Sequence, residues 1–232
     1  MTEKIKSFLF IVISLFVVIF TTKETSSLVQ NNDIFFKNGS RDEKIVALTF
    51  DDGPHPKETH EILDVLDKYN VKATFFVVGK HANWYSEPLI RAAKEGHEIG
   101  NHTFSHPNIT NLSINDLKKE IKTCEETVVK LTGKKPTLFR PPYGSYNEEK
   151  LGKLAEECGY KIILWTTLDA KDWRNPPSAQ ITDTIVSKVQ NGDIILLHDY
   201  GTENTVKALD VIIPTLINNG YKLVTVSELI NK

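Results

Sequence analysis

One pattern of polar and apolar positions repeats along this 232-residue chain from Lys44 onward. In each repeat a helix-like segment ends at a glycine, and a short run of apolar residues follows. The glycines are Gly96, Gly133, Gly159, Gly192 and Gly220. Glycine commonly ends a helix because it adopts the left-handed backbone conformation without strain. The apolar runs predict about seven strands, at 45–50, 72–78, 97–102, 137–140, 160–165, 193–197 and 221–226.

The segments between these strands have the spacing of amphipathic helices. In residues 113–132, Leu117, Ile121, Val128 and Leu131 fall on one helical face, and Ser113 is a suitable first residue. Strands that are apolar throughout and flanked by helices are typical of a parallel sheet buried on both faces. We therefore predict an α/β fold, a closed or nearly closed (β/α) barrel, with an open doubly wound sheet as the alternative.

The first 30 residues follow a different pattern. Lys4 and Lys6 precede an apolar run at 8–20 that is broken only by Ser14, as in an export signal. The run is close to the minimum length of a membrane span, so an uncleaved anchor is favoured over a cleaved signal. The lysines would stay on the cytoplasmic side and the rest of the chain outside. We expect a signal or anchor and tether at 1–30, a linker at 31–43 and a catalytic domain at 44–232.

The linker contains a short apolar stretch, Ile34–Phe36, followed by Asn38-Gly39. A turn at this dipeptide would allow the stretch to form a hairpin with the strand at 45–50.

Composition narrows the choice of function. The chain has 28 Lys and Arg against 30 Asp and Glu, a net charge of −2, which gives no support to nucleic-acid binding. Two cysteines exclude a disulfide-rich scaffold. Export would permit a Cys124–Cys158 bond, but both lie on predicted helices, where buried free thiols are more common.

Polar side chains that can perform chemistry follow five of the predicted strands. They are Asp51 and Asp52, His102 and His106, Arg140, Asp169 and Asp172, and His198 and Asp199. In a barrel the carboxyl ends of the strands meet at one rim, where active sites lie. We therefore expect these side chains to share one site.

Two of these groups have the spacing of a metal site. His102 and His106 are four residues apart, so both imidazoles can bind one ion. Adjacent residues on an extended chain point to opposite sides, so one of Asp51 and Asp52 can bind the ion while the other faces the substrate. Two histidines and one carboxylate leave open positions, as a catalytic ion requires. Zinc is the first expectation, and cobalt, nickel or iron would accept the same ligands.

The remaining histidines are weaker candidates. His55 follows Pro54 and could line a cleft, whereas His60, His81 and His97 are expected at the surface or at helix ends.

Five short motifs at these strand ends resemble the ordered motifs of the polysaccharide deacetylase family, carbohydrate esterase family four. They are TFDDGP (49–54), HTFSH (102–106), RPPYG (140–144), DAKDW (169–173) and LLHD (196–199). The resemblance spans about residues 44–230 and implies a distorted (β/α) barrel and a metal-dependent N-deacetylase. The first motif differs from the Asp-Asn-Gly-Tyr form of the muramic-lactam branch, which makes that branch less favoured.

The resemblance also implies a role for each motif residue. The metal ligands would be Asp52, His102 and His106. The catalytic groups would be Asp51 as general base with Arg140 as its charge partner, and His198 as general acid with Asp172 as its partner. The substrate groups would be the Tyr143 backbone N–H for the oxyanion, and Trp173 and Leu196 around the acetyl methyl group.

Export together with this family favours peptidoglycan N-acetylglucosamine as the substrate. Chitin or chitooligosaccharides are the close alternative, and acetylxylan is less favoured. Trp84, Trp165 and Tyr146 are candidates for stacking on sugar rings. Trp165 lies in an apolar strand, which instead favours a place for it in the hydrophobic core.

Rival hypotheses are a catalytically silent carbohydrate-binding domain and a surface scaffold protein. We expect a monomer that contacts a membrane only through its N-terminal segment.

Overall fold

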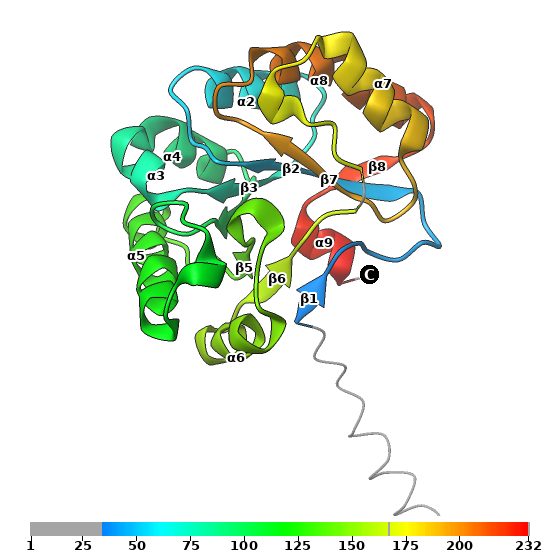
Figure 1. Ribbon diagram of the computed structural model, residues 1–232. Coiled ribbons are helices and arrows are strands. Elements are labelled where there is room, and N and C mark those ends of the chain that lie inside the picture. Colours follow the sequence, from blue (N-terminus) through cyan, green and yellow to red (C-terminus); the bar gives the residue numbers. More distant parts are fainter. Residues whose placement is uncertain (1–33, 167, 232) are drawn as a thin grey trace, which may run out of the picture. The chain divides into compact units, whose positions relative to one another are not determined.

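The centre of the fold is a set of short parallel strands (Figure 1). The computed structural model describes residues 34–166 and 168–231, and within them eight strands pair in parallel. The strands are β1 (Phe35–Phe36), β2 (Ile45–Asp51), β3 (Thr74–Val77), β4 (Glu98–Asn101), β5 (Leu138–Phe139), β6 (Lys161–Ile163), β7 (Ile194–His198) and β8 (Lys222–Val224). Their order is β1-β6-β5-β4-β3-β2-β7, and β8 pairs with β2.

The two ends of this strand order approach each other through irregular segments. Beyond β6, the Thr166 N–H donates to the Ile194 carbonyl of β7 at 3.3 Å, and Asp169 forms a parallel bridge with Leu196. Beyond β1, Asn38 forms an antiparallel bridge with Asp193. The prediction of an α/β fold with about seven parallel strands is confirmed, and these contacts close the sheet into a distorted barrel.

Phe35–Phe36 forms a strand, but not the predicted hairpin. β1 lies parallel to β6, with Phe35 opposite Ile162 and Phe36 opposite Ile163. The carbonyl of Ile34 accepts the Ile162 N–H at 2.6 Å, and the Gly39 N–H donates to the Gly192 carbonyl at 2.8 Å. Residues 34–39 therefore belong to the folded unit and extend it beyond the predicted start at Lys44.

Most of the helices surround the strands on the outside, whereas α9 (Val226–Ile230) packs against the apolar cluster inside the barrel (Figure 1). The other helices are α2 (Glu58–Lys68), α3 (Gly79–Trp84), α4 (Ser86–Lys94), α5 (Ile114–Thr132), α6 (Glu148–Cys158), α7 (Ser178–Lys188) and α8 (Glu203–Asn218), with short 3-10 turns η1 (Ile109–Asn111), η2 (Pro142–Gly144) and η3 (Asp172–Arg174). The predicted helix start is confirmed, because the Ser113 side chain accepts the Asp116 N–H. Gly133 and Gly159 end α5 and α6 in the left-handed conformation, each with φ of 73°.

The strand β2 shows how side-chain alternation divides the interior. Val46, Leu48 and Phe50 pack with residues of α2, α7 and α8 in the largest apolar cluster. Ile45 and Ala47 point the other way and pack with Phe76, Leu138, Ile163 and Ile194 inside the barrel. Because the alternation has period two, Thr49 and Asp51 continue on this inner side toward the carboxyl ends of the strands. The barrel interior is therefore apolar at one end and polar at the other.

Two sequence-based expectations concern parts of the chain away from this sheet. The predicted signal or anchor at 1–30 lies outside the described residues. Among residues 34–166 and 168–231 no helix has the length and apolar character needed to cross a membrane. Cys124 of α5 and Cys158 of α6 are both buried and free, so the Cys124–Cys158 bond does not form.

A close approach between β4 and β3 generates a stability prediction. A Cβ at Gly100 would lie 2.4 Å from Cδ1 of Phe76, inside the barrel cluster. Gly100→Ala should therefore lower the free energy of unfolding by about 1–3 kcal/mol, the usual cost of overpacking a core. Urea unfolding followed by circular dichroism measures the change.

The matched control for this substitution is Gly152→Ala. A Cβ at Gly152 in α6 would meet Phe35 at an ordinary 3.5 Å. Alanine favours a helix over glycine, so this variant should gain about 0.5–1 kcal/mol. Equal stabilities of the two alanine variants would contradict the packing argument.

Candidate active site

The register of the strands brings the predicted site residues to one rim. In the β2–β7 pair Asp51 lies opposite His198, and Asn101 of β4 lies opposite both Val77 of β3 and Phe139 of β5. The residues that directly follow these strand ends include Asp52, His102 and Arg140. Parallel strands in register thus place side chains that are far apart in sequence next to one another.

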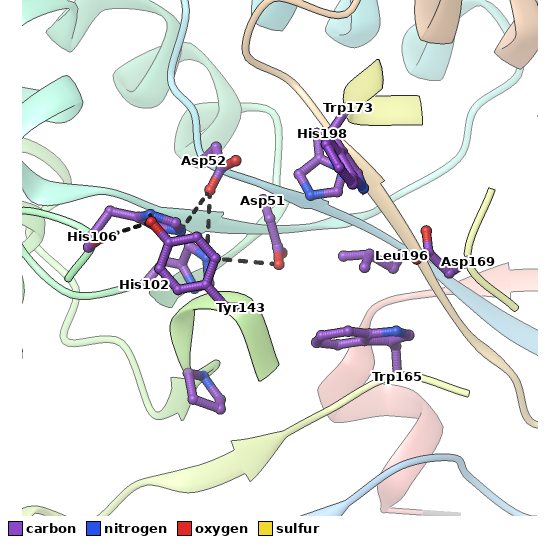
Figure 2. A pocket seen from close by; sticks show the side chains of 11 residues that line it. Asp51, Asp52, His102, His106, Tyr143, Trp165, Asp169, Trp173, Leu196 and His198 are labelled. Atoms are coloured by element: carbon purple, nitrogen blue, oxygen red, sulfur yellow. Dashed lines mark hydrogen bonds and ion pairs between the residues drawn. The ribbon is translucent and has the colours of Figure 1, made fainter. Parts of the chain in front are cut away.

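Asp52, His102 and His106 form a cluster with the geometry of a metal site (Figure 2). Asp52 Oδ1 lies 3.1 Å from His106 Nε2 and 3.5 Å from His102 Nε2. One ligand atom of each residue lies within 4.8 Å of the other two. Two imidazole nitrogens and one carboxylate oxygen fit a divalent ion of the zinc type and leave positions open for other ligands. Of the two adjacent aspartates, it is Asp52 that belongs to this cluster.

Contacts on the far side of each imidazole orient both histidines. Nδ1 of His102 lies 2.7 Å from the Arg140 carbonyl, which can only accept, so Nδ1 carries a proton and Nε2 is the nitrogen that faces Asp52 and is positioned to bind an ion. Nδ1 of His106 lies 3.2 Å from the Tyr143 hydroxyl. Burial alone would raise the pKa of Asp52, but hydrogen bonds from His102 and His106, with the charges of His102 and His198, lower it well below its ordinary value. The cluster thus favours an ionised carboxylate.

Asp51, the other aspartate, pairs with a fully buried arginine. Asp51 Oδ1 accepts from Nη1 of Arg140 at 2.7 Å, and neither side chain is more than 5% exposed. The same Nη1 donates to Thr49 Oγ1, while Nη2 and Nε donate to the carbonyls of Leu164 and Ile163. Arg140 therefore holds one carboxylate oxygen of Asp51. The other, Oδ2, lies 3.8 Å from Nε2 of His102, at the edge of the candidate metal site.

His198 is held by Asp172 from behind. Asp172 Oδ1 lies 2.8 Å from His198 Nδ1, and Oδ2 accepts the His198 backbone N–H and the Thr205 hydroxyl, each at 2.8 Å. Burial would lower the pKa of His198, but the hydrogen bond and charge of Asp172, with the charges of Asp51 and Asp52, raise it to about 9. The imidazole is therefore protonated at neutral pH.

These groups line a cavity of about 400 Å³. Figure 2 shows Asp51 and Asp52 between the pair of metal-site histidines and His198. The other lining residues are Pro141, Tyr143, Trp165, Asp169, Trp173 and Leu196. A cavity of this size with apolar walls and a few convergent polar groups is typical of a small-molecule or sugar site.

The structure changes the expected positions of several aromatic residues. Trp165 lines the cavity, and a Cβ at Gly144 would meet its ring at 2.6 Å, so only glycine fits there. Tyr146 instead stacks on Phe35, with 5.4 Å between ring centroids, and Trp84 is exposed beneath the Lys80 ammonium. Of the three aromatic residues considered for sugar stacking, only Trp165 lines this cavity.

His97, expected at the surface or a helix end, is buried just before β4, at the end of that strand away from the site, and its Nδ1 accepts the Ala73 N–H at 3.2 Å. Two residues next to the site have contacts that the sequence analysis did not predict. His81 lies in the last turn of α3, in agreement with a helix-end position, and its Nδ1 contacts the backbone carbonyl of Asp52 at 2.6 Å. Asp199, which had no assigned role, accepts the Gly53 N–H at 2.9 Å. Its place beside His198 in the LLHD motif was the only sequence signal for it.

Comparison with known proteins agrees with this geometry. The sequence profile of the polysaccharide deacetylase family matches residues 38–163. The peptidoglycan-N-acetylmuramic acid deacetylase PdaC of Bacillus subtilis is 44% identical over 188 residues, which are 81% of this chain and 39% of that protein. A peptidoglycan-N-acetylglucosamine deacetylase of Bacillus cereus is also 44% identical, over 81% of this chain and 89% of its own length.

A solved structure of a similar protein has the same fold as this chain. The crystal structure of the Bc1960 peptidoglycan N-acetylglucosamine deacetylase in complex with a naphthyl N-hydroxybenzamide superposes with a TM-score of 0.83. The two chains are 36% identical, and the match covers 87% of this chain and 95% of the other. Since the profile matches more than half of the sequence and the relatives match most of it, the chain belongs to the polysaccharide deacetylase family of hydrolases.

Proposed function

We propose that this protein removes N-acetyl groups from the N-acetylglucosamine residues of peptidoglycan, with a divalent metal ion held by Asp52, His102 and His106. One observation carries the proposal above all others. A carboxylate fixed by a buried arginine and an imidazole fixed by a buried carboxylate line the same cavity as the three candidate ligands. This is the combination that hydrolysis of an amide requires: a base for water, an acid for the amine and an electrophile for the carbonyl.

The metal ion contributes chemistry that side chains alone lack. When bound, a divalent ion of the zinc type lowers the pKa of a water molecule and polarises a carbonyl group. The observed donor set, two Nε2 atoms and Oδ1 of Asp52, suits zinc, and cobalt or nickel would accept the same ligands.

Asp51 is the proposed general base. Its Oδ1 is engaged by Arg140, while Oδ2 lies near the metal-site histidine His102. In this arrangement Oδ2 would accept a proton from the water molecule as the water oxygen bonds to the acetyl carbonyl carbon. Arg140 is fully buried and also donates a hydrogen bond to Thr49. The direction of the Asp51 side chain is therefore fixed before substrate binds.

His198 is the proposed general acid. The C–N bond of the amide breaks only if the departing nitrogen receives a proton, since an amide anion is a poor leaving group. Asp172 keeps His198 in its charged form, with a pKa of about 9, so a proton is available at neutral pH. Transfer of that proton would release the amine of glucosamine and acetate.

The walls of the cavity suit the remaining parts of the acetyl group. We assign the backbone N–H of Tyr143 to the developing oxyanion, a role typical of amides at the edge of a hydrolase site. Tyr143 adopts a left-handed backbone, with φ of 59°, in a short turn that follows β5. Trp173 and Leu196, which line the cavity near His198, would surround the methyl group, and Trp165 provides an additional aromatic wall.

The choice of peptidoglycan rests on the relatives and on the N-terminal sequence. The matched proteins include deacetylases of both N-acetylglucosamine and N-acetylmuramic acid in peptidoglycan. We favour N-acetylglucosamine, which lacks the carboxylate of muramic acid, since the cavity already contains the three carboxylates Asp51, Asp52 and Asp169. We further propose that Lys4, Lys6 and the apolar run at 8–20 direct the domain across the membrane, where a monomer would act on the wall.

The rival from another class is a carbohydrate-binding domain without activity. A binding domain gains nothing from the buried Arg140–Asp51 pair or from the Asp172–His198 pair, and burying such charges costs free energy. The presence of both pairs therefore favours the enzyme.

The first test combines activity with metal content. Purified protein should release acetate from peptidoglycan, lose this activity with a chelator and regain it with Zn²⁺. Asp51→Asn should lower kcat by about 10²–10⁴-fold, the usual value of a general base, while the bound metal measured by mass spectrometry stays constant. Asp183→Asn makes the same chemical change at an exposed site in α7 and should leave kcat unchanged.

The outcomes of this test separate the hypotheses. Acetate release from chitooligosaccharides but not from peptidoglycan would replace the proposed substrate by chitin. Glycan binding without acetate release would support the silent binding domain. Near-native kcat in Asp51→Asn would remove Asp51 from the role of base.

The second test uses the pH dependence of kcat. A general acid with a raised pKa is protonated below that value, so activity should persist through neutral pH and fall as pH rises through about 9. Asp172→Asn removes the charge that favours the imidazolium, so the alkaline fall in kcat should move down by about 1–3 pH units. An unchanged alkaline limb would contradict the assignment of His198, and Asp183→Asn again serves as the control.

A further inference from the structure

The backbone that carries Asp52 adopts a conformation that the residue itself does not favour. Asp52 directly follows β2 and has φ of 75°, in the left-handed region that costs an L-residue free energy. Such a conformation persists only when surrounding groups determine it. The groups that contact the backbone of Asp52 and Gly53 therefore decide where the Asp52 carboxylate points.

Asp199 holds the Asp52–Gly53 peptide unit from one side. Its Oδ1 accepts the Gly53 N–H at 2.9 Å, and its Oδ2 accepts the Thr59 hydroxyl at 2.6 Å. A Cβ at Gly53 would lie 2.1 Å from the Asp199 carboxylate, so the contact requires glycine at this position. Asp199 is 1% exposed, and burial raises its pKa to about 7. Both groups that donate to it, the Gly53 N–H and the Thr59 hydroxyl, are uncharged. Burying a carboxylate costs free energy, and here its hydrogen bond to Gly53 holds the backbone of this turn.

His81 holds the same peptide unit from the other side. Its Nδ1 lies 2.6 Å from the Asp52 carbonyl, which can only accept, so Nδ1 carries a proton and donates it. The imidazole stacks on Tyr200, with ring centroids 4.3 Å apart and planes within 17°. Tyr200 directly follows Asp199, so one short segment after β7 acts on both sides of the peptide unit. The carbonyl of Gly53 accepts the Val78 N–H at 2.9 Å and completes the set.

From these contacts we propose that Asp199 and His81 are positioning residues for the candidate metal ligand Asp52. Asp199 accepts the N–H of the peptide unit between Asp52 and Gly53, and His81 donates to the carbonyl of the same unit. Together they stabilise the left-handed turn that directs the Asp52 carboxylate toward His102 and His106. The Asp52 carboxylate is then oriented before an ion binds, so the free energy of ion binding is not reduced by the cost of ordering the turn. This inference rests on the proposed metal centre.

His81 allows the cleaner test, because its two contacts can be removed separately. His81→Phe keeps a ring to stack on Tyr200 but loses the donor to the Asp52 carbonyl. His81→Asn loses the stack but places an amide N–H where Nδ1 lies. If the donor positions Asp52, His81→Phe should raise the dissociation constant for Zn²⁺ by about 10–100-fold, as the loss of a residue that supports a metal ligand does. His81→Asn should bind Zn²⁺ nearly as tightly as the wild-type protein.

Asp199 is tested by a parallel pair. Asp199→Ala leaves the Gly53 N–H without its acceptor and should weaken Zn²⁺ binding by a similar factor. Asp199→Asn keeps an oxygen for the Gly53 N–H and should restore most of the affinity. If Asp199→Ala does not fold, the two His81 variants decide the question.

The measurement is competition for Zn²⁺ with a chromophoric chelator at pH 8, together with the visible spectrum of the Co²⁺-loaded protein, which reports ligand geometry. His60→Phe is the matched control, since His60 lies in α2 and contacts Arg91. Thermal unfolding of the metal-free variants measures stability separately. A merely structural role would lower stability and leave the Zn²⁺ affinity and Co²⁺ spectrum unchanged.

Two results would overturn the inference in distinguishable ways. If the wild-type protein does not bind Zn²⁺ or Co²⁺, the proposed metal centre fails and this inference fails with it. If the wild-type protein binds Zn²⁺ and His81→Phe binds it equally tightly, the metal centre stands and the positioning role of His81 is wrong.

Discussion

The buried side chain of Arg140 joins the parts of this site to one another. Its guanidinium contacts Asp51, Thr49 and two carbonyls of the β6 segment, and its own carbonyl accepts from His102. Burial lowers the pKa of Arg140, and Asp51 opposes that effect. A charge placed inside a barrel is tolerated only when its hydrogen bonds are satisfied, so the arrangement of β2, β5 and β6 and the arrangement of the site depend on each other.

The two adjacent aspartates show how one turn can serve two purposes. Asp51 is the last residue of β2 and points into the barrel, where Arg140 fixes it. Asp52 lies one residue further, in a left-handed conformation, and joins His102 and His106. On the adjacent strand β7, His198 is held in its charged form by Asp172. Neighbouring groups with opposite preferences for the proton are what acid–base hydrolysis needs.

Much of the fold could be predicted because its signals are local. The apolar runs marked the strands, the glycines marked the ends of α5 and α6, and Ser113 marked the start of α5. The position of β1 could not be predicted, because a two-residue strand carries little pattern and its partner β6 lies more than 120 residues away. The same applies to the closure of the barrel, which uses irregular segments after β1 and β6.

The sequence by itself determined which side chains meet, because the carboxyl ends of parallel strands share a rim and five of those ends carry Asp, His or Arg. Residue spacing alone could not decide which of Asp51 and Asp52 binds the ion, and only the family resemblance assigned the two roles. Nor could the sequence place Trp165 in the cavity, or relate His81 and Asp199 to the turn at Gly53. These features depend on a positive φ, on ring packing and on hydrogen bonds between residues that are 29 and 146 positions apart. Only the tertiary structure brings such groups within a few ångströms, and hydrogen bonding acts only at that distance.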